Sequence, residues 1–285
     1  MTSLLLGLLI GSQRDVPTFT VLENVTYRTV GKRKLMLDVY RPSGTRPPPF
    51  AIVVHGGGWI AGKRQDVAPL CEALARNGIA AVAVDYRLAP TAKWPAMLED
   101  CQVAASYVNA QAGRLGLRRD SAVTAGFSAG AHIALLMAMK DTEPGAQKAG
   151  APKKIRFKGV LNVFGPTQLN EDFPLDLRDA VSKSLIGKPY SLATKSAEEM
   201  SPVAHVSRDA PPVFTIHGEQ DTLVPVMQAT RLDKALKAAG VDSTVRVIPG
   251  MGHELKTSLP ACSLAVEDGI AFLMKRLAVR RTKAS

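Results

Sequence analysis

Aromatic residues and cysteines are scarce in this sequence. Phe, Tyr and Trp make up 5% of its 285 residues, and there are three cysteines, Cys71, Cys101 and Cys262. The cysteines lie far apart and form no spacing typical of a zinc site, so we expect no metal centre. Cys71 and Cys101 fall among apolar neighbours in predicted helices, which indicates buried thiols. The alternative is a disulfide between these two, which would require an oxidising compartment.

Long hydrophobic runs are missing as well. A membrane-spanning helix needs about 20 consecutive apolar residues, and no segment of the chain has them. Residues 4–10 resemble the hydrophobic region of an export signal, but no basic segment precedes them and no A-x-A follows. We expect residues 1–19 to be an N-terminal segment or a remnant of such a signal. Residues 20–285 then form one domain, in a secreted or periplasmic protein rather than a cytoplasmic one.

Acidic residues are outnumbered by basic ones. The chain has 25 Asp and Glu against 36 Lys and Arg, and its formal net charge is +11. Much of the positive charge lies at residues 153–158 and 275–283. These cations are not interleaved with aromatic residues, which would stack on nucleic-acid bases. We therefore expect a solvated basic surface and no nucleic-acid partner.

Strand patterns alternate with helix patterns along most of the chain. Two antiparallel strands are predicted at residues 25–30 and 34–42. From residue 51 onward, short apolar runs such as AIVVHGGG and SAVTAGF each precede a helical segment. This alternation predicts an α/β fold with a mostly parallel, doubly wound sheet and helices on both faces. Residues 168–207 break the rhythm, and we expect a small cap insertion there.

The segment GFSAG, residues 126–130, fits the pattern G-x-S-x-G. It lies between a predicted strand and an apolar helix, where this pattern forms a sharp turn that exposes the serine. Larger side chains at Gly126 and Gly130 would clash in such a turn. The helix that begins after Ser128 also favours negative charge developing there. We predict Ser128 as a nucleophile, with a plain glycine-rich turn as the alternative.

A serine nucleophile requires a base, and the sequence has five histidines. Four of them lie in a glycine-rich loop, along the helix after the serine, in the insertion, or at a strand end; these are His55, His132, His205 and His217. His253 instead follows the last strand on a glycine-rich loop that can return over the sheet edge. We predict His253 as the base and Asp221, on the loop after the preceding strand, as its acid, with Glu219 as the fallback. The order Ser, acid, His is that of α/β-hydrolases.

Residues 52–64, IVVHGGGWIAGKR, contain two overlapping patterns. Read from Gly57, the segment is one residue short of the nucleotide-binding pattern G-x-x-x-x-G-K-[ST], because Arg64 stands where a hydroxyl group would bind Mg²⁺. Read from His55, it is HGGGW, a loop whose backbone N–H groups can bind an oxyanion. A phosphate loop would leave the predicted Ser, Asp and His unexplained, so we favour the second interpretation.

The oxyanion donors are therefore predicted to be backbone N–H groups of the glycine loop and of the residue after the nucleophile. The candidates are Gly56, Gly57, Gly58 and Ala129. The sequence leaves open which glycines donate. Trp59 and Phe127 flank these positions, and we predict that they contact the substrate. For Trp59, a core position under the loop is the alternative.

These motifs together resemble a known family. HGGGW, DYRLAP, WPAMLEDC, GFSAG, HGEQD and GMGH occur in the order seen in α/β-hydrolase carboxylesterases, and they resemble the hormone-sensitive-lipase-like and the acetyl-xylan and feruloyl esterase groups over residues 20–275. The resemblance implies the α/β-hydrolase fold and ester hydrolysis without a cofactor. It also implies that five residues brace the site without reacting: Asp85, Tyr86, Arg87, Pro95 and Asp100. Phe127 stands where the hormone-sensitive-lipase group usually has Asp, which favours the xylan and feruloyl esterase side or the arylformamidases.

We therefore expect a serine carboxylesterase that hydrolyses short-acyl or aryl esters, either small molecules or esters linked to a polysaccharide. Two alternatives remain. One is an arylformamidase or another amide hydrolase of the same fold. The other is a non-catalytic binding protein, although such proteins often lack a member of the triad. The sequence does not indicate an oligomeric state.

Overall fold

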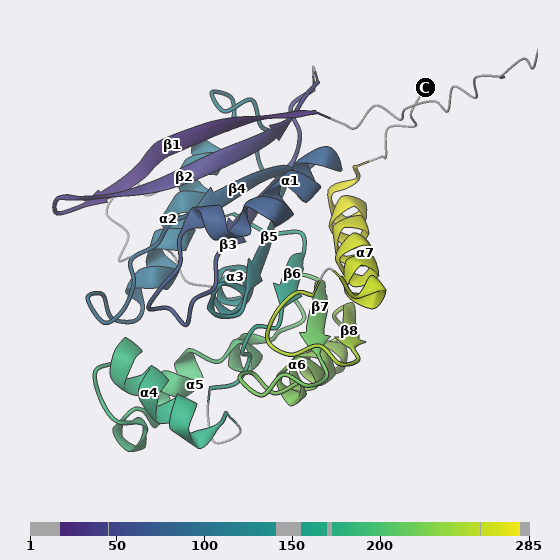
Figure 1. Ribbon diagram of the computed structural model, residues 1–285. Helices are drawn as coiled ribbons and strands as arrows, with labels where there is room; N and C mark the ends of the chain where they lie inside the picture. The colour runs from purple at the N-terminus through teal and green to yellow at the C-terminus, as the bar shows by residue number, and fades with distance from the viewer. Residues whose placement is uncertain (1–17, 45, 141–154, 170–172, 257, 280–285) are drawn as a thin grey trace, which may run out of the picture.

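The computed structural model describes residues 18–44, 46–140, 155–169, 173–256 and 258–279 (Figure 1). The possible export signal at residues 4–10 and the parts of the basic segments at residues 153–154 and 280–283 lie outside these ranges. The strands are β1 (Phe19–Val30), β2 (Arg33–Pro42), β3 (Phe50–Val54), β4 (Ala80–Val84), β5 (Ala122–Phe127), β6 (Val160–Val163), β7 (Val213–Gly218) and β8 (Ser243–Ile248). The α-helices are α1 (Ala68–Arg76), α2 (Ala96–Ala110), α3 (Ala129–Met139), α4 (Leu175–Leu185), α5 (Thr194–Glu199), α6 (Met227–Ala238) and α7 (Pro260–Leu277). Short 3₁₀ helices are η1 (Arg64–Val67), η2 (Tyr190–Leu192) and η3 (Pro202–His205).

The strands of the described residues form one eight-stranded sheet in the order β1-β2-β4-β3-β5-β6-β7-β8. The pairs β1–β2 and β2–β4 are antiparallel, and all other pairs are parallel. The prediction of a mostly parallel sheet is confirmed. Every residue of β3 and β4 is buried, as expected for central strands that are covered on both faces.

Helices cover both faces of the sheet (Figure 1). Helices α1 and α7 pack on one face, and α2, α3 and α6 pack on the other. The side chains of β3 alternate between the two cores, with Ala51 and Val53 facing α1 and α7 and Ile52 facing the opposite core. All three cysteines are free and buried. Cys71 and Cys101 belong to opposite cores, so the disulfide considered from the sequence is wrong.

The carboxyl ends of the parallel strands meet at one edge of the sheet, because parallel strands share a direction. The loops after β3, β5, β7 and β8 therefore converge there. The segment between β6 and β7 begins at this edge, and Figure 1 shows its helices α4 and α5 beyond the end to which β7 points. Both helices lie within residues 168–207, where a cap insertion is expected. Because β6 and β7 are parallel, the segment then returns to the opposite edge, where β7 begins.

A buried carboxylate holds β1 and the segment after β4 against α2. Asp100 of α2 is fully buried, and its Oδ2 accepts from Arg87 Nε at 2.7 Å and its Oδ1 from Arg87 Nη2 at 3.0 Å. Arg28 Nη1 lies 2.6 Å from the same Oδ1. The backbone N–H of Arg87 donates a further bond at 3.0 Å. Several donors thus converge on this carboxylate, as a buried charge requires.

A second buried ion cluster anchors the end of the glycine loop. Arg64, 8% exposed, lies with its Nε 2.8 Å from Asp38 of β2 and its Nη1 2.7 Å from Asp85 after β4. Its Nη2 donates to Asn24 of β1. Arg64 therefore joins three segments of the chain, and this accounts for an arginine where a phosphate loop would have Ser or Thr. The bracing that the resemblance implies for Asp85 and Asp100 agrees with these contacts.

Candidate active site

Ser128 lies at the turn between β5 and α3 with φ 51° and ψ −121°. A non-glycine residue with positive φ is uncommon, and such strain concentrates at functional sites. The two flanking glycines are required by close backbone contacts. A Cβ atom at Gly126 would lie 2.5 Å from the carbonyl of Gly130, and a Cβ at Gly130 would lie 2.2 Å from the oxygen of Val54. The turn is therefore as tight as the pattern G-x-S-x-G predicts.

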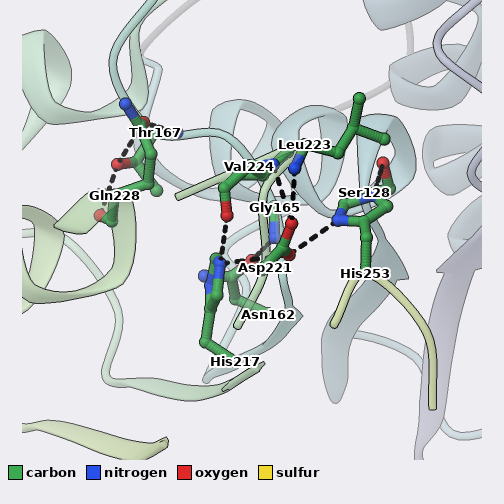
Figure 2. Close-up of polar contacts among 10 residues, drawn as sticks. All are labelled: Ser128, Asn162, Gly165, Thr167, His217, Asp221, Leu223, Val224, Gln228 and His253. Atoms are coloured by element: carbon green, nitrogen blue, oxygen red, sulfur yellow. Dashed lines mark hydrogen bonds and ion pairs between the residues drawn. The ribbon is translucent and has the colours of Figure 1, made fainter. Parts of the chain in front are cut away.

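The structure brings Ser128, His253 and Asp221 together in one hydrogen-bonded line (Figure 2). His253 Nε2 lies 2.8 Å from Ser128 Oγ, and His253 Nδ1 lies 2.7 Å from Asp221 Oδ2. Because an ionised carboxylate only accepts, Nδ1 carries the proton and Nε2 accepts from the serine hydroxyl. The fallback acid, Glu219, is exposed and lies outside this line.

Asp221 is held by the turn that it begins. Its Oδ1 accepts the backbone N–H groups of Leu223 at 3.0 Å and Val224 at 2.8 Å. Burial by itself raises the pKa of this carboxyl. Hydrogen bonds from His217, His253 and Val224 outweigh burial and hold the pKa well below its usual range. Asp221 is therefore ionised at neutral pH and can stabilise a positive charge on His253.

The glycine loop starts directly after β3, beside the nucleophile. A Cβ at Gly56 would lie 3.4 Å from the Cβ of Ser128, so this backbone approaches the serine closely. Gly57, at φ 109°, accepts the N–H groups of Ile60 and Ala61 through its carbonyl, which folds the loop back on itself. Gly58 is exposed, with φ 58°, and a Cβ there would make only an ordinary contact with Ile60 at 3.9 Å. Of the three predicted glycines, Gly56 is thus the one with a close contact to Ser128 among its nearest neighbours.

The remaining predicted donor, Ala129, is the first residue of α3. The backbone N–H groups of the first turn of a helix have no partner within the helix, and they form the positive end of its dipole. The N–H of Ala129 is thus positioned next to the serine hydroxyl, at the end of the helix that favours an anion.

His55 stabilises the glycine loop through its contacts with Tyr86 and Gly56. Its ring stacks on Tyr86 with a centroid distance of 4.3 Å, and Tyr86 donates its hydroxyl to the His55 carbonyl at 3.0 Å. Nδ1 lies 2.7 Å from the Gly56 carbonyl, so it carries the proton. Burial lowers the pKa of His55 and keeps it neutral. A Cβ at Gly62 would lie 2.4 Å from that Nδ1, which explains the glycine that completes the apparent phosphate-loop pattern.

Trp59 packs in the core, which favours the alternative to the predicted contact with the substrate. The side chain is 3% exposed and belongs to the core that contains α2 and α3. Its indole N–H donates to His132 Nδ1 at 3.3 Å, and the two rings meet edge to face. The alternative, an aromatic residue packed under the loop, describes this position. Phe127 is half-buried, with its ring 6.1 Å from that of Phe164.

Three other histidines lie outside the line of reacting groups, as expected. His132 is fully buried and donates from Nε2 to the Met200 carbonyl at 2.7 Å, which joins α3 to the segment between β6 and β7. Burial lowers the pKa of His132 to about 4. His205 donates to the Glu199 carbonyl at 2.8 Å. His217 donates to the Val224 carbonyl at 2.7 Å and also lies 3.4 Å from Asp221.

Sequence reasoning did not identify several residues that support the site. Phe164, at the end of β6, has φ 42° and places its ring 4.6 Å from that of His253. Gln228 of α6 is fully buried and accepts the backbone N–H group of Thr167 at 2.8 Å (Figure 2) and that of Gln168 at 2.7 Å. The available signal for His217 was its position at a strand end, directly before the loop that carries Asp221.

The described residues contain no group of His, Cys, Asp or Glu side chains arranged to hold a metal ion. Within the same ranges, no helix combines the length and apolar composition needed to cross a membrane.

The family model that matches this chain, described as BD-FAE, covers residues 37–236. Among curated relatives, a probable carboxylic ester hydrolase of Mycobacterium tuberculosis, LipM, is 32% identical over 72% of this chain. The versiconal hemiacetal acetate esterase of Dothistroma septosporum is 29% identical over 84% of this chain and 78% of its own length. The chain spans 49% of LipM, and 56% and 62% of two further Mycobacterium tuberculosis esterases.

Solved structures establish the fold independently. A truncated carbohydrate esterase from gut microbiota superposes with a TM-score of 0.80 at 22% identity, covering 93% of this chain and 98% of that one. A thermophilic esterase from Thermogutta terrifontis, Est2, gives a TM-score of 0.74 at 22% identity, covering 92% and 93%. The predicted α/β-hydrolase fold is confirmed.

Proposed function

The chain belongs to the BD-FAE family and has the α/β-hydrolase fold, and we propose that it is a serine carboxylesterase acting on short-acyl or aryl esters. The observation that carries this proposal is the line from Ser128 Oγ through His253 to Asp221, with contacts of 2.8 and 2.7 Å. A nucleophile bonded to a base that is oriented by a third group is the arrangement that acyl transfer requires. The names of LipM and the versiconal acetate esterase support the same chemistry.

In the proposed mechanism, Ser128 attacks the ester carbonyl while His253 takes its proton. Asp221 keeps the His253 ring in the Nδ1–H form and stabilises the imidazolium. The N–H of Ala129 and that of Gly56 or a neighbouring glycine bind the tetrahedral oxyanion, where loss of one donor costs roughly 3–4 kcal/mol. His253 then protonates the alcohol that leaves, and water hydrolyses the acyl-enzyme with His253 again as the base.

We further propose that residues 168–207 cap this site. The segment leaves β6 at the carboxyl edge, and it is held at its start and near Met200. Gln228 binds Thr167 and Gln168 at its start, and His132 binds Met200 near its end. The substrate is either a small ester or an ester linked to a polysaccharide. The name of the gut-microbial carbohydrate esterase supports the second possibility.

The test is acylation and turnover of the Ser128→Ala variant. We expect wild type to release p-nitrophenol from p-nitrophenyl acetate in a burst and to be labelled by a fluorophosphonate at Ser128. Ser128→Ala should lose activity by a factor of about 10⁴–10⁶ and take no label, because the nucleophile is missing. Ser106→Ala, in the middle of α2, serves as a matched control and should keep both.

The same assay tests the alternatives. Faster hydrolysis of formyl-kynurenine or another formamide than of any ester in a panel of acyl lengths, acetylated xylan and methyl ferulate would show an amide hydrolase instead. A wild-type protein that neither hydrolyses esters nor accepts the fluorophosphonate would be a binding protein.

A further inference from the structure

His217 has contacts that the proposed mechanism does not use. It is the next-to-last residue of β7, and its side chain is fully buried. Its Nε2 lies 2.7 Å from the carbonyl oxygen of Val224 and 3.4 Å from Asp221 Oδ2. Asp221 Oδ2 is the atom that accepts the hydrogen bond of His253. Two imidazole rings therefore approach the same carboxylate oxygen, one from the reacting side and one from the core (Figure 2).

The protonation state of His217 follows from its partners. A carbonyl oxygen and an ionised carboxylate can only accept, so Nε2 must carry a proton. The other nitrogen, Nδ1, is buried and has no hydrogen-bond partner in the described part of the chain. A second proton there would create a buried N–H group without an acceptor, which is unfavourable. His217 is therefore a neutral ring with its single N–H aimed at the turn that begins at Asp221.

This N–H closes a ring of hydrogen bonds around the turn. Asp221 Oδ1 accepts the N–H groups of Leu223 and Val224, so the carboxylate holds the backbone of the turn. The carbonyl of Val224 in turn accepts from His217, which is anchored in β7. The turn can rotate away from His253 only if the bond to His217 breaks. With the turn held in this way, Asp221 Oδ2 faces the ring of His253 and has the N–H of His217 on its other side.

We propose that His217 is a positioning residue that holds Asp221 Oδ2 against His253 through the turn of residues 221–224. This inference rests on the proposed function, because it assigns a task within the same triad. His217 does not touch the substrate. It acts through Asp221 by keeping both the side chain and the backbone of the acid's turn in place.

The test compares three substitutions of His217 in the full chain. The amide of His217→Gln can reach the position of Nε2 and donate, whereas the shorter His217→Asn and the apolar His217→Leu cannot. We expect kcat for p-nitrophenyl acetate to fall roughly 10- to 100-fold in the Asn and Leu variants, with KM within about twofold, since small misplacements of catalytic groups have effects of this size. His217→Gln should recover most of kcat.

Asn77→Leu is the matched control, because it also removes a side-chain bond to a backbone carbonyl, that of Ala73, at the end of α1 and outside the site. It should keep wild-type kcat. If His217→Leu does not fold, comparing kcat of the Gln variant with that of the Asn variant still tests the inference, since both side chains are polar. Equal kcat in the Gln and Asn variants would overturn the inference.

A second readout separates positioning from general structural support. In an Asp221→Asn background, replacing His217 by Asn should lower the remaining activity by less than about twofold, because groups that act through one another are not additive. An undiminished effect in that background would contradict action through Asp221. Failure of the proposed function is distinguishable, since wild type would then show neither ester turnover nor fluorophosphonate labelling.

Discussion

Two regions at the carboxyl edge of the sheet are built from charged and polar side chains, but their hydrogen-bond networks differ in the groups at which they end. Around Asp100, Arg28 and Arg87 meet a fully buried carboxylate with several donors. Around Asp221, the hydrogen bonds run outward through His253, whose side chain is 17% exposed, to a half-buried hydroxyl group at Ser128. The first network is closed in the sense that its central carboxylate is fully buried among protein donors, although the side chains of Arg28 and Arg87 are 29% and 20% exposed. The second ends on a hydroxyl group that a substrate can reach.

The difference indicates a division of tasks. Removing the charge of a fully buried carboxylate is strongly destabilising, because its charge-assisted hydrogen bonds are lost and their donors are left without a matching acceptor. An open network can lose its last member without exposing any core. We therefore expect substitutions around Asp100 to lower stability and substitutions at Ser128 to lower activity. Three variants test this separation.

The largest effect is expected at Gly130, where one substitution should lower both activity and stability. In Gly130→Ala the new Cβ would lie 2.2 Å from the oxygen of Val54 and 2.3 Å from that of His55. Helix α3 must shift away from β3, which moves Ser128 relative to the glycine loop. We expect esterase activity to fall by about 100-fold or more, together with a loss of stability of about 1–3 kcal/mol or more.

Activity and urea-unfolding measurements on purified protein check this. Gly113→Ala is the control, because its Cβ would have nothing within 4 Å, and it should change stability by less than about 0.5 kcal/mol. Wild-type activity in Gly130→Ala would show that α3 can accommodate the methyl group without moving the serine.

Asp100→Asn tests the prediction that substitutions around the buried carboxylate lower stability and leave activity intact. The substitution keeps the shape of the side chain but leaves Arg28 and Arg87 without their buried counter-charge. We expect the free energy of unfolding to fall by about 3–5 kcal/mol, with kcat of the folded protein within about twofold of wild type. Chemical denaturation and active-site titration measure the two quantities separately.

The control for Asp100 is Glu72→Gln, which removes an exposed i,i+4 pair with Arg76 and should cost about 0.3–0.5 kcal/mol. Equal destabilisation by the two variants would contradict the view that the Asp100 cluster is closed and strongly coupled.

The smallest effect concerns pH. Burial lowers the pKa of His132 to about 4, whereas an unfolded histidine titrates near about 6.5. Between these values the unfolded chain binds more protons, so stability falls as the pH decreases. The two pKa values correspond to about 2 kcal/mol lost by pH 5 and about 3 kcal/mol near pH 4. Urea unfolding at pH 7.5 and pH 5 measures the loss.

His132→Gln should reduce that pH dependence by the same amount, because the titrating group is gone. His205→Gln is the control, since His205 is only partly buried, and it should keep the wild-type slope. An unchanged slope in His132→Gln would show that other groups account for the acid sensitivity.

Much of the fold was predictable because its signals are local. Strands such as β3 and β4 are short apolar runs followed by helices with their own apolar faces, and this alternation specifies a parallel sheet. The glycines around Ser128 likewise report a local steric requirement. For Trp59 the sequence left a substrate contact and a core position open, because sequence position next to the glycine loop does not determine the side to which a side chain points. Its partner, His132, lies 73 residues further along the chain.

The sequence by itself determined the strand–turn–helix unit that exposes Ser128, the glycine loop after β3 and the chain order of the predicted triad, because each depends on neighbouring residues. Only the tertiary structure decided which groups meet. The parallel pairing of β7 with β8 brings the loops of Asp221 and His253 to one edge, and contact between β5 and α3 sets the serine beside them. His217 of β7 is buried behind Asp221, and the pairing of β2 with β4 brings Asp38 and Asp85 to Arg64. Hydrogen bonds between residues far apart in the chain depend on the register of the sheet, and no local pattern encodes that register.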